Sequence, residues 1–184
     1  MELYDDSYYI ERIKQGDTTC FACLIDRYGQ QVFTLVVRIV RSREDAEELT
    51  QDIFLKVFRT LGGFRGGSSF STWLYRIAYN TAVSATRKTK REYLCLDDDA
   101  LAGVSEEAAD LRLGCLGNEA QLDRLDRALE QLPPDDRALV ALFYLQEKTV
   151  AAVAAVTGIS ESNVKTRLHR IRKKLYVLLN ERED

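Results

Sequence analysis

The chain of 184 residues is poor in the residue types from which many functional sites are built. It has one histidine, four cysteines, two prolines and one tryptophan. No apolar run reaches the roughly 18 residues that a membrane span needs. The first residues, 1–6, are acidic and lack the basic and apolar parts of a signal peptide. We therefore expect no membrane insertion and a cytoplasmic location, where thiols are normally reduced.

The scarcity of histidine and cysteine argues against a metal centre. A tetrahedral zinc site needs a second ligand pair beside the CxxC of Cys20 and Cys23, but Cys95, Cys115 and His169 are isolated in the sequence. Cys20 and Cys23 lie three apart in a helical pattern, which predicts small buried or half-buried residues on one face; zinc binding or redox sensing is the alternative. No nucleophile–base pair and no phosphate-binding loop is visible. The sequence thus predicts no enzyme, no metal and no cofactor.

Charge is unevenly distributed along the chain, although the whole carries a net charge of only −3. The formal net charge is −4 over residues 1–50, +6 over 51–92, −8 over 93–135 and +3 over 136–184. Two basic zones separated by an acidic one predict two separate contacts with nucleic acid.

Helical periodicity dominates the sequence, and strand signals are scarce. We predict an all-α fold of two helical domains, residues 1–92 and 120–184, joined by a flexible acidic linker over 93–119. The expected helices cover residues 7–15, about 18–41 with Asp17 or Thr18 as the cap, 43–61 with Ser42 as the cap, about 71–91 with Ser69 or Ser71 as the cap, 121–132, 135–145, 149–157 and 160–180. The linker is interpreted as a solvated tether; acidic mimicry of DNA or docking in a basic channel is the alternative.

Residues 149–160, TVAAVAAVTGIS, have the pattern of a helix-turn-helix. Gly158 supplies a left-handed helix end without a Cβ clash, and Ser160 is a good N-cap for the next helix. Residues 165–174 of that helix include six basic residues and no acidic one, which fits binding in a DNA major groove. A solvated basic face on a bundle helix is the alternative, which the preceding turn disfavours. The only histidine, His169, lies on this basic face, so DNA contact is favoured over a structural role. The predicted buried stripe of the same helix consists of Val164, Leu168, Ile171 and Leu175.

Residues 64–82, FRGGSSFSTWLYRIAYNTA, join a glycine-rich loop to an aromatic and basic helix. Such a combination suits single-stranded DNA, because bases stack on aromatic rings for roughly 1–3 kcal/mol each and cations hold the backbone. Leu74 and Ile77 are predicted to be core residues, whereas Trp73 could serve either the core or a base.

These motifs together resemble bacterial sigma-70-type factors, in particular the small extracytoplasmic-function group. The resemblance rests on AEELTQDIFLKVFRTL at 46–61, on the 64–82 segment, and on LPPDDRALVALFYL and TGISESNVKTRLHRIRKKL in the C-terminal third. It covers nearly the whole chain outside the linker. It implies a region 2 domain and a region 4 domain that bind core RNA polymerase and direct it to promoters, without catalytic chemistry of their own.

The resemblance also assigns roles to three groups of residues. The group expected to bind the coiled coil of the largest polymerase subunit consists of Glu48, Leu49, Gln51, Asp52, Ile53 and Phe54. The group expected to read the −10 promoter element consists of Lys56, Phe64, Arg65, Ser68, Ser69, Trp73, Arg76 and Asn80. The group expected to read the −35 element consists of Ser162, Asn163, Lys165, Thr166, His169 and Arg170. Further expected partners are the polymerase flap region and an anti-sigma factor.

Two consequences of this interpretation can be stated at once. Unstacking duplex DNA costs about 1.4 kcal/mol per step, so opening several steps costs on the order of 5–10 kcal/mol, and the protein without polymerase is expected to bind promoters poorly. The acidic linker is expected to weaken unassisted DNA binding further by competing for the basic surface. The alternative function is a helix-turn-helix regulator that acts without the polymerase core, which leaves the 46–61 and 64–82 segments unexplained.

Overall fold

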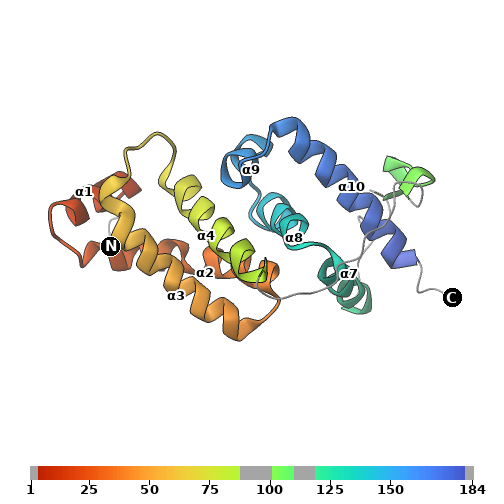
Figure 1. Cartoon of the computed structure of the whole chain (residues 1–184), viewed down its shortest axis with the longest axis horizontal. Helices are drawn as coiled ribbons and strands as arrows, with labels where there is room; N and C mark the ends of the chain where they lie inside the picture. Colours follow the sequence, from red (N-terminus) through yellow and green to blue (C-terminus); the bar gives the residue numbers. More distant parts are fainter. Residues whose placement is uncertain (1–3, 88–100, 110–118, 181–184) are drawn as a thin grey trace. The chain divides into compact units, whose positions relative to one another are not determined.

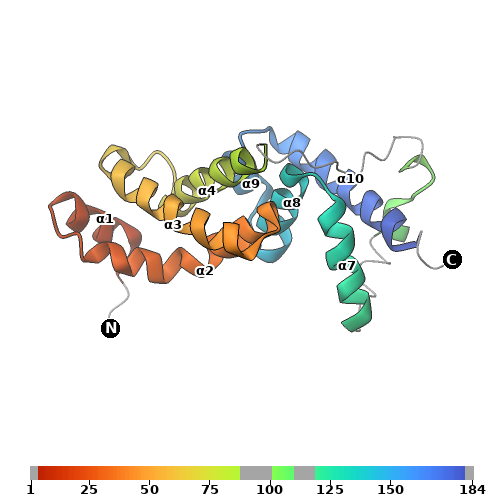
Figure 2. The ribbon, with the colours of Figure 1, turned by 60° about the horizontal axis from the view of Figure 1, so that its bottom comes forward.

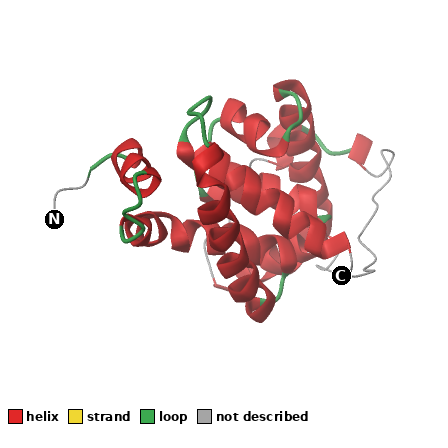
Figure 3. Ribbon diagram, turned by 60° about the vertical axis from the view of Figure 1, so that its left-hand side comes forward, coloured by secondary structure: helices red, strands yellow, loops and turns green. Residues whose placement is uncertain are grey.

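The computed structural model describes residues 4–87, 101–109 and 119–180, and within these ranges it contains helices and loops but no strand (Figure 1, Figure 3). The all-α prediction is therefore confirmed. The chain divides into two compact units, one built mainly from helices α1 to α4 and the other from helices α7 to α10. The finer limits of the two domains and the linker, 1–92, 93–119 and 120–184, stay a prediction.

The N-terminal unit is a bundle around one long central helix. Its elements are α1 (Asp6–Lys14), α2 (Cys20–Val40), α3 (Arg43–Thr60), the short helical turn η1 (Leu61–Gly63) and α4 (Phe70–Arg87). Helix α2 packs against α1, α3 and α4, as the two ribbon views show (Figure 1, Figure 2). Apolar side chains at helical spacing fill the space between these helices, and the fully buried ones include Leu24, Leu35, Ile39, Ile53 and Leu74.

The helix ends show which predicted caps form. Ser42 accepts a hydrogen bond from the N–H of Asp45 at 3.2 Å, and Ser69 accepts one from the N–H of Thr72 at 3.2 Å, as predicted. The predicted cap of α2 is wrong, because α2 begins at Cys20 after Thr19, whose side chain makes no capping bond. The Asp17 carboxylate instead accepts hydrogen bonds from the side chains of Arg12, Thr19 and Cys20 around the turn between α1 and α2.

The C-terminal unit gathers three helices and a wide helical turn around the last helix. Its elements are α7 (Glu119–Gln131), α8 (Pro134–Val140), the wide turn η2 (Ala141–Leu145), α9 (Val150–Thr157) and α10 (Glu161–Asn180). Helix α10 packs against α7 and α8. The predicted helix over 135–145 therefore consists of two parts, since the chain widens after Val140 and the N–H of Gln146 reaches back to the carbonyl of Ala141 at 3.0 Å.

Residues 101–109, which fall in the predicted linker, are described and belong to the C-terminal unit. The sequence predicted a flexible segment here, but Leu101, Val104 and Ala109 are buried. Ser105 accepts a hydrogen bond from the N–H of Ala108 at 3.1 Å and so caps a short helical turn. The apolar side chains in this acidic stretch explain why it packs. The rest of the predicted linker, 93–100 and 110–118, lies outside the described residues.

Candidate nucleic-acid and partner interfaces

The turn between α9 and α10 has the predicted helix-turn-helix conformation. Gly158 has φ of +79°, where a side chain would be strained, and Ser160 accepts a hydrogen bond from the N–H of Asn163 at 3.2 Å. A second cap was not predicted: Thr149 accepts a hydrogen bond from the N–H of Ala152 at 3.2 Å at the start of α9. Its position directly before an apolar helix could have indicated it. These bonds set the path of the chain into α10.

Helix α10 has a buried apolar stripe and an exposed polar face. The stripe is the predicted one, with Val164, Leu168, Ile171 and Leu175 all buried. Among the residues expected to read the −35 element, those with exposed side chains are Ser162, Asn163, Lys165, Thr166 and Arg170. His169 is half-buried. The exposed face therefore presents hydroxyl, amide and cationic groups together, which is the mixture that contacts bases and phosphates.

Two of the six basic residues of α10 point away from that face. Arg167 donates to the carboxylate of Asp136 on α8, with Nη2 at 2.6 Å from Oδ1, and Lys174 Nζ lies 3.3 Å from Oδ2 of the same group. Asp136 is buried, with 8% of its side chain exposed. The ion pairs thus fasten the candidate DNA-reading helix to α8. Counting basic residues in the sequence overestimated the cationic face, because the sequence does not show which charges are paired internally.

Glu106, in the predicted linker, contacts the basic helix directly. Its Oε1 lies 3.1 Å from Nδ1 of His169 and 2.7 Å from Nη2 of Arg172. The hydrogen bond with His169, followed by that with Arg172, holds the pKa of the Glu106 carboxyl below its usual range. The carboxylate is consequently charged at neutral pH and covers one edge of the candidate −35 reader. No local pattern in the sequence indicates these contacts of Glu106.

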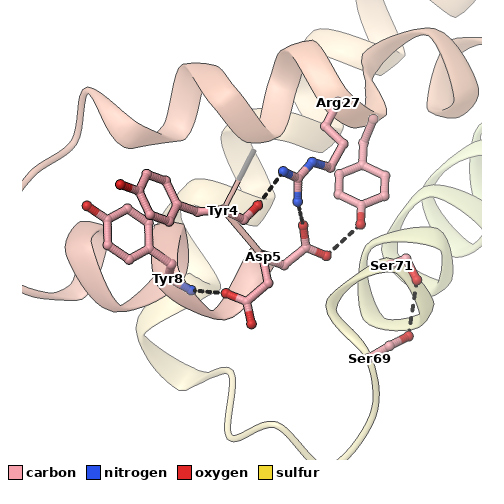
Figure 4. Close-up of polar contacts among 8 residues, drawn as sticks. Tyr4, Asp5, Tyr8, Arg27, Ser69 and Ser71 are labelled. Atoms are coloured by element: carbon pink, nitrogen blue, oxygen red, sulfur yellow. Dashed lines mark hydrogen bonds and ion pairs between the residues drawn. The ribbon is translucent and has the colours of Figure 1, made fainter. Parts of the chain in front are cut away.

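The loop expected to read the −10 element is supported by a cluster of aromatic rings. The ring centroids of Phe64 and Trp73 lie 5.2 Å apart, and those of Phe64 and Phe70 lie 6.0 Å apart. Ser69 and Ser71 face each other at the start of α4, with their hydroxyl oxygens 3.1 Å apart (Figure 4). Within the loop, Gly66 has φ of +73°, which favours glycine.

The predicted −10 residues differ in exposure. Lys56, Arg65, Ser68, Ser69, Arg76 and Asn80 are exposed, and Phe64 and Trp73 are half-buried. Trp73 therefore contacts the aromatic cluster and still offers part of its ring to solvent. Leu74 is fully buried, as predicted, whereas Ile77 is only half-buried.

Behind the loop, a buried hydrogen bond joins α4 to α2. The hydroxyl of Tyr75 donates to Oε1 of Gln31 at 2.7 Å, and the ring of Tyr75 is almost fully buried. Burial raises the pKa of Tyr75 to about 12, so the hydroxyl stays neutral at physiological pH. The bond holds α4 on a rigid support, which the candidate reader needs.

An apolar groove of about 650 Å³ lies between α2 and α3. Its lining includes Phe21, Gln51 and Phe54, and three large apolar residues on its walls are unusually exposed: Ile25 at 40%, Leu55 at 52% and Phe58 at 38%. Exposed apolar groups that gather in one place mark an interaction surface. The sequence prediction did not include Leu55 and Phe58. Both lie outside the buried apolar stripe of α3, and large apolar residues at such positions could have indicated a partner surface.

The six residues expected to bind polymerase all lie on α3, but they differ in how far their side chains are exposed. Glu48, Gln51 and Asp52 are exposed, and Leu49 is half-buried. Phe54 is mostly buried and lines the groove. Ile53 is fully buried and so belongs to the core of the bundle, where it supports the surface without reaching a partner. That placement corrects its predicted role in direct contact.

Cys20 and Cys23 are both free and half-buried near the start of α2. The Sγ of Cys20 lies 3.5 Å from Oδ2 of Asp17, and burial raises the pKa of the Cys20 thiol. A raised pKa makes the thiol less reactive at neutral pH. In the described parts of the chain, no group of three or more histidine, cysteine or acidic side chains is placed to hold a metal ion. Nor is any described helix both long and apolar enough to span a membrane.

Comparison with known proteins matches both units to one family. The model for "Sigma-70 region 2" matches residues 24–92, and the model for "Sigma-70, region 4" matches residues 122–175. The ECF RNA polymerase sigma factor SigW of Bacillus subtilis is 31% identical over 177 residues, which cover 90% of this chain and 92% of SigW. The ECF RNA polymerase sigma-E factor of Escherichia coli K12 is 33% identical over 179 residues, which cover 94% of this chain and 93% of that factor.

Fold and sequence therefore define a two-domain protein of the sigma-70 type. More narrowly, the chain belongs to the extracytoplasmic-function (ECF) RNA polymerase sigma factors.

Solved structures show the same fold. The chain is similar to CnrH in its complex with the cytosolic domain of CnrY, with a TM-score of 0.69 and 22% identity over 96% of this chain and 98% of CnrH. It is also similar to the sigma factor RpoE in complex with the anti-sigma factor NepR from Bartonella quintana, with a TM-score of 0.64 and 21% identity over 86% of this chain and 96% of RpoE.

Proposed function

We propose that this protein binds core RNA polymerase, directs it to promoters through −10 and −35 contacts, and supports promoter opening as an alternative sigma factor. The observation that carries the proposal is the presence of two separate candidate DNA readers in one chain of this family. One is the exposed face of α10, and the other is the aromatic loop before α4. The protein supplies binding and positioning and has no catalytic role of its own in this scheme.

The α10 face is proposed to bind the −35 element as duplex DNA. Its exposed residues include Lys165, Thr166 and Arg170, and the N-terminal part of such a helix reaches base edges in the major groove. The loop before α4 is proposed to bind the −10 element once it is single-stranded. There, Trp73 can stack on a base while Arg65 and Arg76 hold phosphates.

The α3 surface is proposed to bind the polymerase core. The exposed carboxylates of Glu48 and Asp52 suit a basic partner, and the nearby groove suits an apolar side chain. The structural relatives CnrH and RpoE were solved with CnrY and NepR. By analogy, we propose that an anti-sigma protein also binds this sigma factor and keeps it inactive in the cytoplasm.

The direct test is run-off transcription with purified core polymerase on duplex and on pre-melted promoters. The proposed function predicts specific starts on both templates when the protein is added. A helix-turn-helix regulator without a core-binding role would bind DNA but would give no specific starts with core polymerase.

Replacing Leu55 by aspartate tests the groove. Because burying a leucine side chain in an interface is worth about 1.5–3 kcal/mol, we expect affinity for core polymerase to fall roughly tenfold to a hundredfold. Folding should be retained, since Leu55 is 52% exposed. Fluorescence anisotropy with labelled protein measures the affinity. Leu122 in α7 is equally exposed at 52%, so Leu122→Asp is the matched control. An equal loss of affinity in both variants would show that the groove is not part of the surface that binds core polymerase.

The acidic segment is proposed to compete with DNA through Glu106. Replacing Glu106 by glutamine removes the charge that faces His169 and Arg172, and exposed ion pairs of this kind are worth about 0.2–1 kcal/mol each. We therefore expect about twofold to thirtyfold tighter binding of the variant to a −35 duplex at low salt, with the difference vanishing at high salt. The neighbouring exposed Glu107 provides the control variant Glu107→Gln. Identical affinities of the two variants would show that Glu106 does not compete.

A further inference from the structure

The N-terminal helix α1 contacts the loop that we propose reads the −10 element. Nζ of Lys14, at the last residue of α1, donates to the backbone carbonyl of Phe64 at 2.9 Å. The same ammonium lies 3.7 Å from Oε1 of Glu11, on the same helix. Phe64 is the residue whose ring contacts Trp73. A single side chain of α1 therefore holds the backbone on which the aromatic cluster is built.

Packing beneath this bond makes α1 a fixed support. Ile10 and Ile13 of α1 are buried, and so is Leu61 of η1, the turn that leads into the loop. Helix α1 and η1 lie in contact. At the same end of α1, the turn to α2 is closed by Arg12, whose Nη2 lies 2.7 Å from the Asp17 carboxylate. Hydrogen bonds from Thr19 and then Arg12 lower the pKa of Asp17 to about 2, so this closure persists at every physiological pH.

A second chain of contacts runs from α1 to the same cluster. Asp6 accepts hydrogen bonds from Arg27 and from the hydroxyl of Tyr28, both at 2.5 Å. The ring of Tyr28 in turn lies 5.6 Å from that of Phe70. Arg27 also donates to the carbonyl of Tyr4 at 2.6 Å (Figure 4). Two separate sets of contacts thus connect α1 with the loop: Lys14 binds Phe64 at its start, and Asp6 acts through Tyr28 on Phe70 at its end.

We infer that Lys14 is a positioning residue for −10 recognition: through the Phe64 carbonyl it holds the 64–69 loop in the conformation that receives the DNA strand. The inference rests on the proposed function and extends it to α1, which lies before the residues matched by the region 2 model. Lys14 is not expected to contact DNA itself, since its ammonium is engaged with the loop and Glu11.

The test compares Lys14→Met, Lys14→Arg and the control Glu11→Gln in the full-length protein. Hydrogen exchange of the amides of residues 64–69 measures the loop without polymerase. Open-complex formation with core polymerase, followed by the fluorescence of 2-aminopurine in the −10 element, measures the function. For Lys14→Met we expect the amides of residues 64–69 to exchange about threefold to tenfold faster and open-complex formation to fall by about threefold to tenfold. The affinity for −35 duplex DNA should stay unchanged. Lys14→Arg should restore both readouts to within about twofold, and Glu11→Gln should match the unmodified protein.

The two readouts separate this inference from the proposed function. If the unmodified protein fails to open promoters, the proposed function is wrong, while loop exchange still reports whether Lys14 holds the loop. If the unmodified protein opens promoters and Lys14→Met does so equally well, the inference is overturned. It is also overturned if Lys14→Arg behaves like Lys14→Met, or if Lys14→Met weakens −35 binding by the same factor.

Discussion

Replacing Asp136 by asparagine is expected to lower the free energy of unfolding of the C-terminal unit by about 3 kcal/mol, because removing one partner of a buried ion pair leaves the other charges uncompensated. Asp136 is buried and binds Arg167 at 2.6 Å and Lys174 at 3.3 Å. For a unit of this size, the loss corresponds to a fall in the melting temperature of roughly 10–20 °C. Thermal unfolding followed by circular dichroism measures it.

Exposed Asp123 on α7 provides the control variant Asp123→Asn, which is expected to change stability by less than about 0.5 kcal/mol. Hydrogen exchange locates the effect: amides of α8 and α10 should exchange faster in Asp136→Asn, whereas those of α2 and α4 should not. A melting temperature equal to that of the control would mean that the ion pairs of Asp136 do not stabilise the packing of α10 on α8. Weaker −35 binding is the expected functional consequence, since α10 carries the proposed −35 reader.

Replacing Trp73 by alanine is expected to reduce open-complex formation on a duplex promoter by about fivefold to a hundredfold. The physical reason is the loss of a stacking surface worth roughly 1–3 kcal/mol per base, combined with the loss of the ring that contacts Phe64 and Phe70 at 5.2 and 5.9 Å. Permanganate reactivity of unpaired thymines in the −10 element measures the opening. Affinity for core polymerase is expected to stay the same.

Trp73→Phe keeps an aromatic surface and should recover most of the activity, which distinguishes stacking from simple loss of packing. Circular dichroism shows whether the alanine variant is still folded, as expected for a half-buried residue outside the fully buried core. Opening by Trp73→Ala at the rate of the unmodified protein would refute a role of this ring in strand capture.

The predicted helices were recovered because their patterns are local. The i, i+3, i+4 spacing of apolar residues, the Ser42, Ser69 and Ser160 caps and the left-handed Gly158 all depend on a few neighbouring residues. The α8 region was less regular than predicted, because the widening at η2 depends on hydrogen bonds that the apolar pattern does not encode.

The candidate site was predicted only in part, for reasons of tertiary packing. The count of six basic residues over 165–174 includes Arg167 and Lys174, but the buried Asp136 pairs with both. Ile53 looks like part of a partner surface, but it is fully buried beneath it. The contacts of Glu106 and Lys14 were not predicted, since their partners His169 and Phe64 lie 50 or more residues away along the chain.

The sequence by itself determined the all-α class, the helix-turn-helix, the basic face and the family, because each depends on periodicity, capping or motif order within short segments. Only the tertiary structure decided which charges of α10 face outward, which residues of α3 form the apolar groove, and that α1 and the acidic segment reach the two candidate readers. These depend on side chains brought together from distant parts of the chain, and contacts of that kind leave no local pattern.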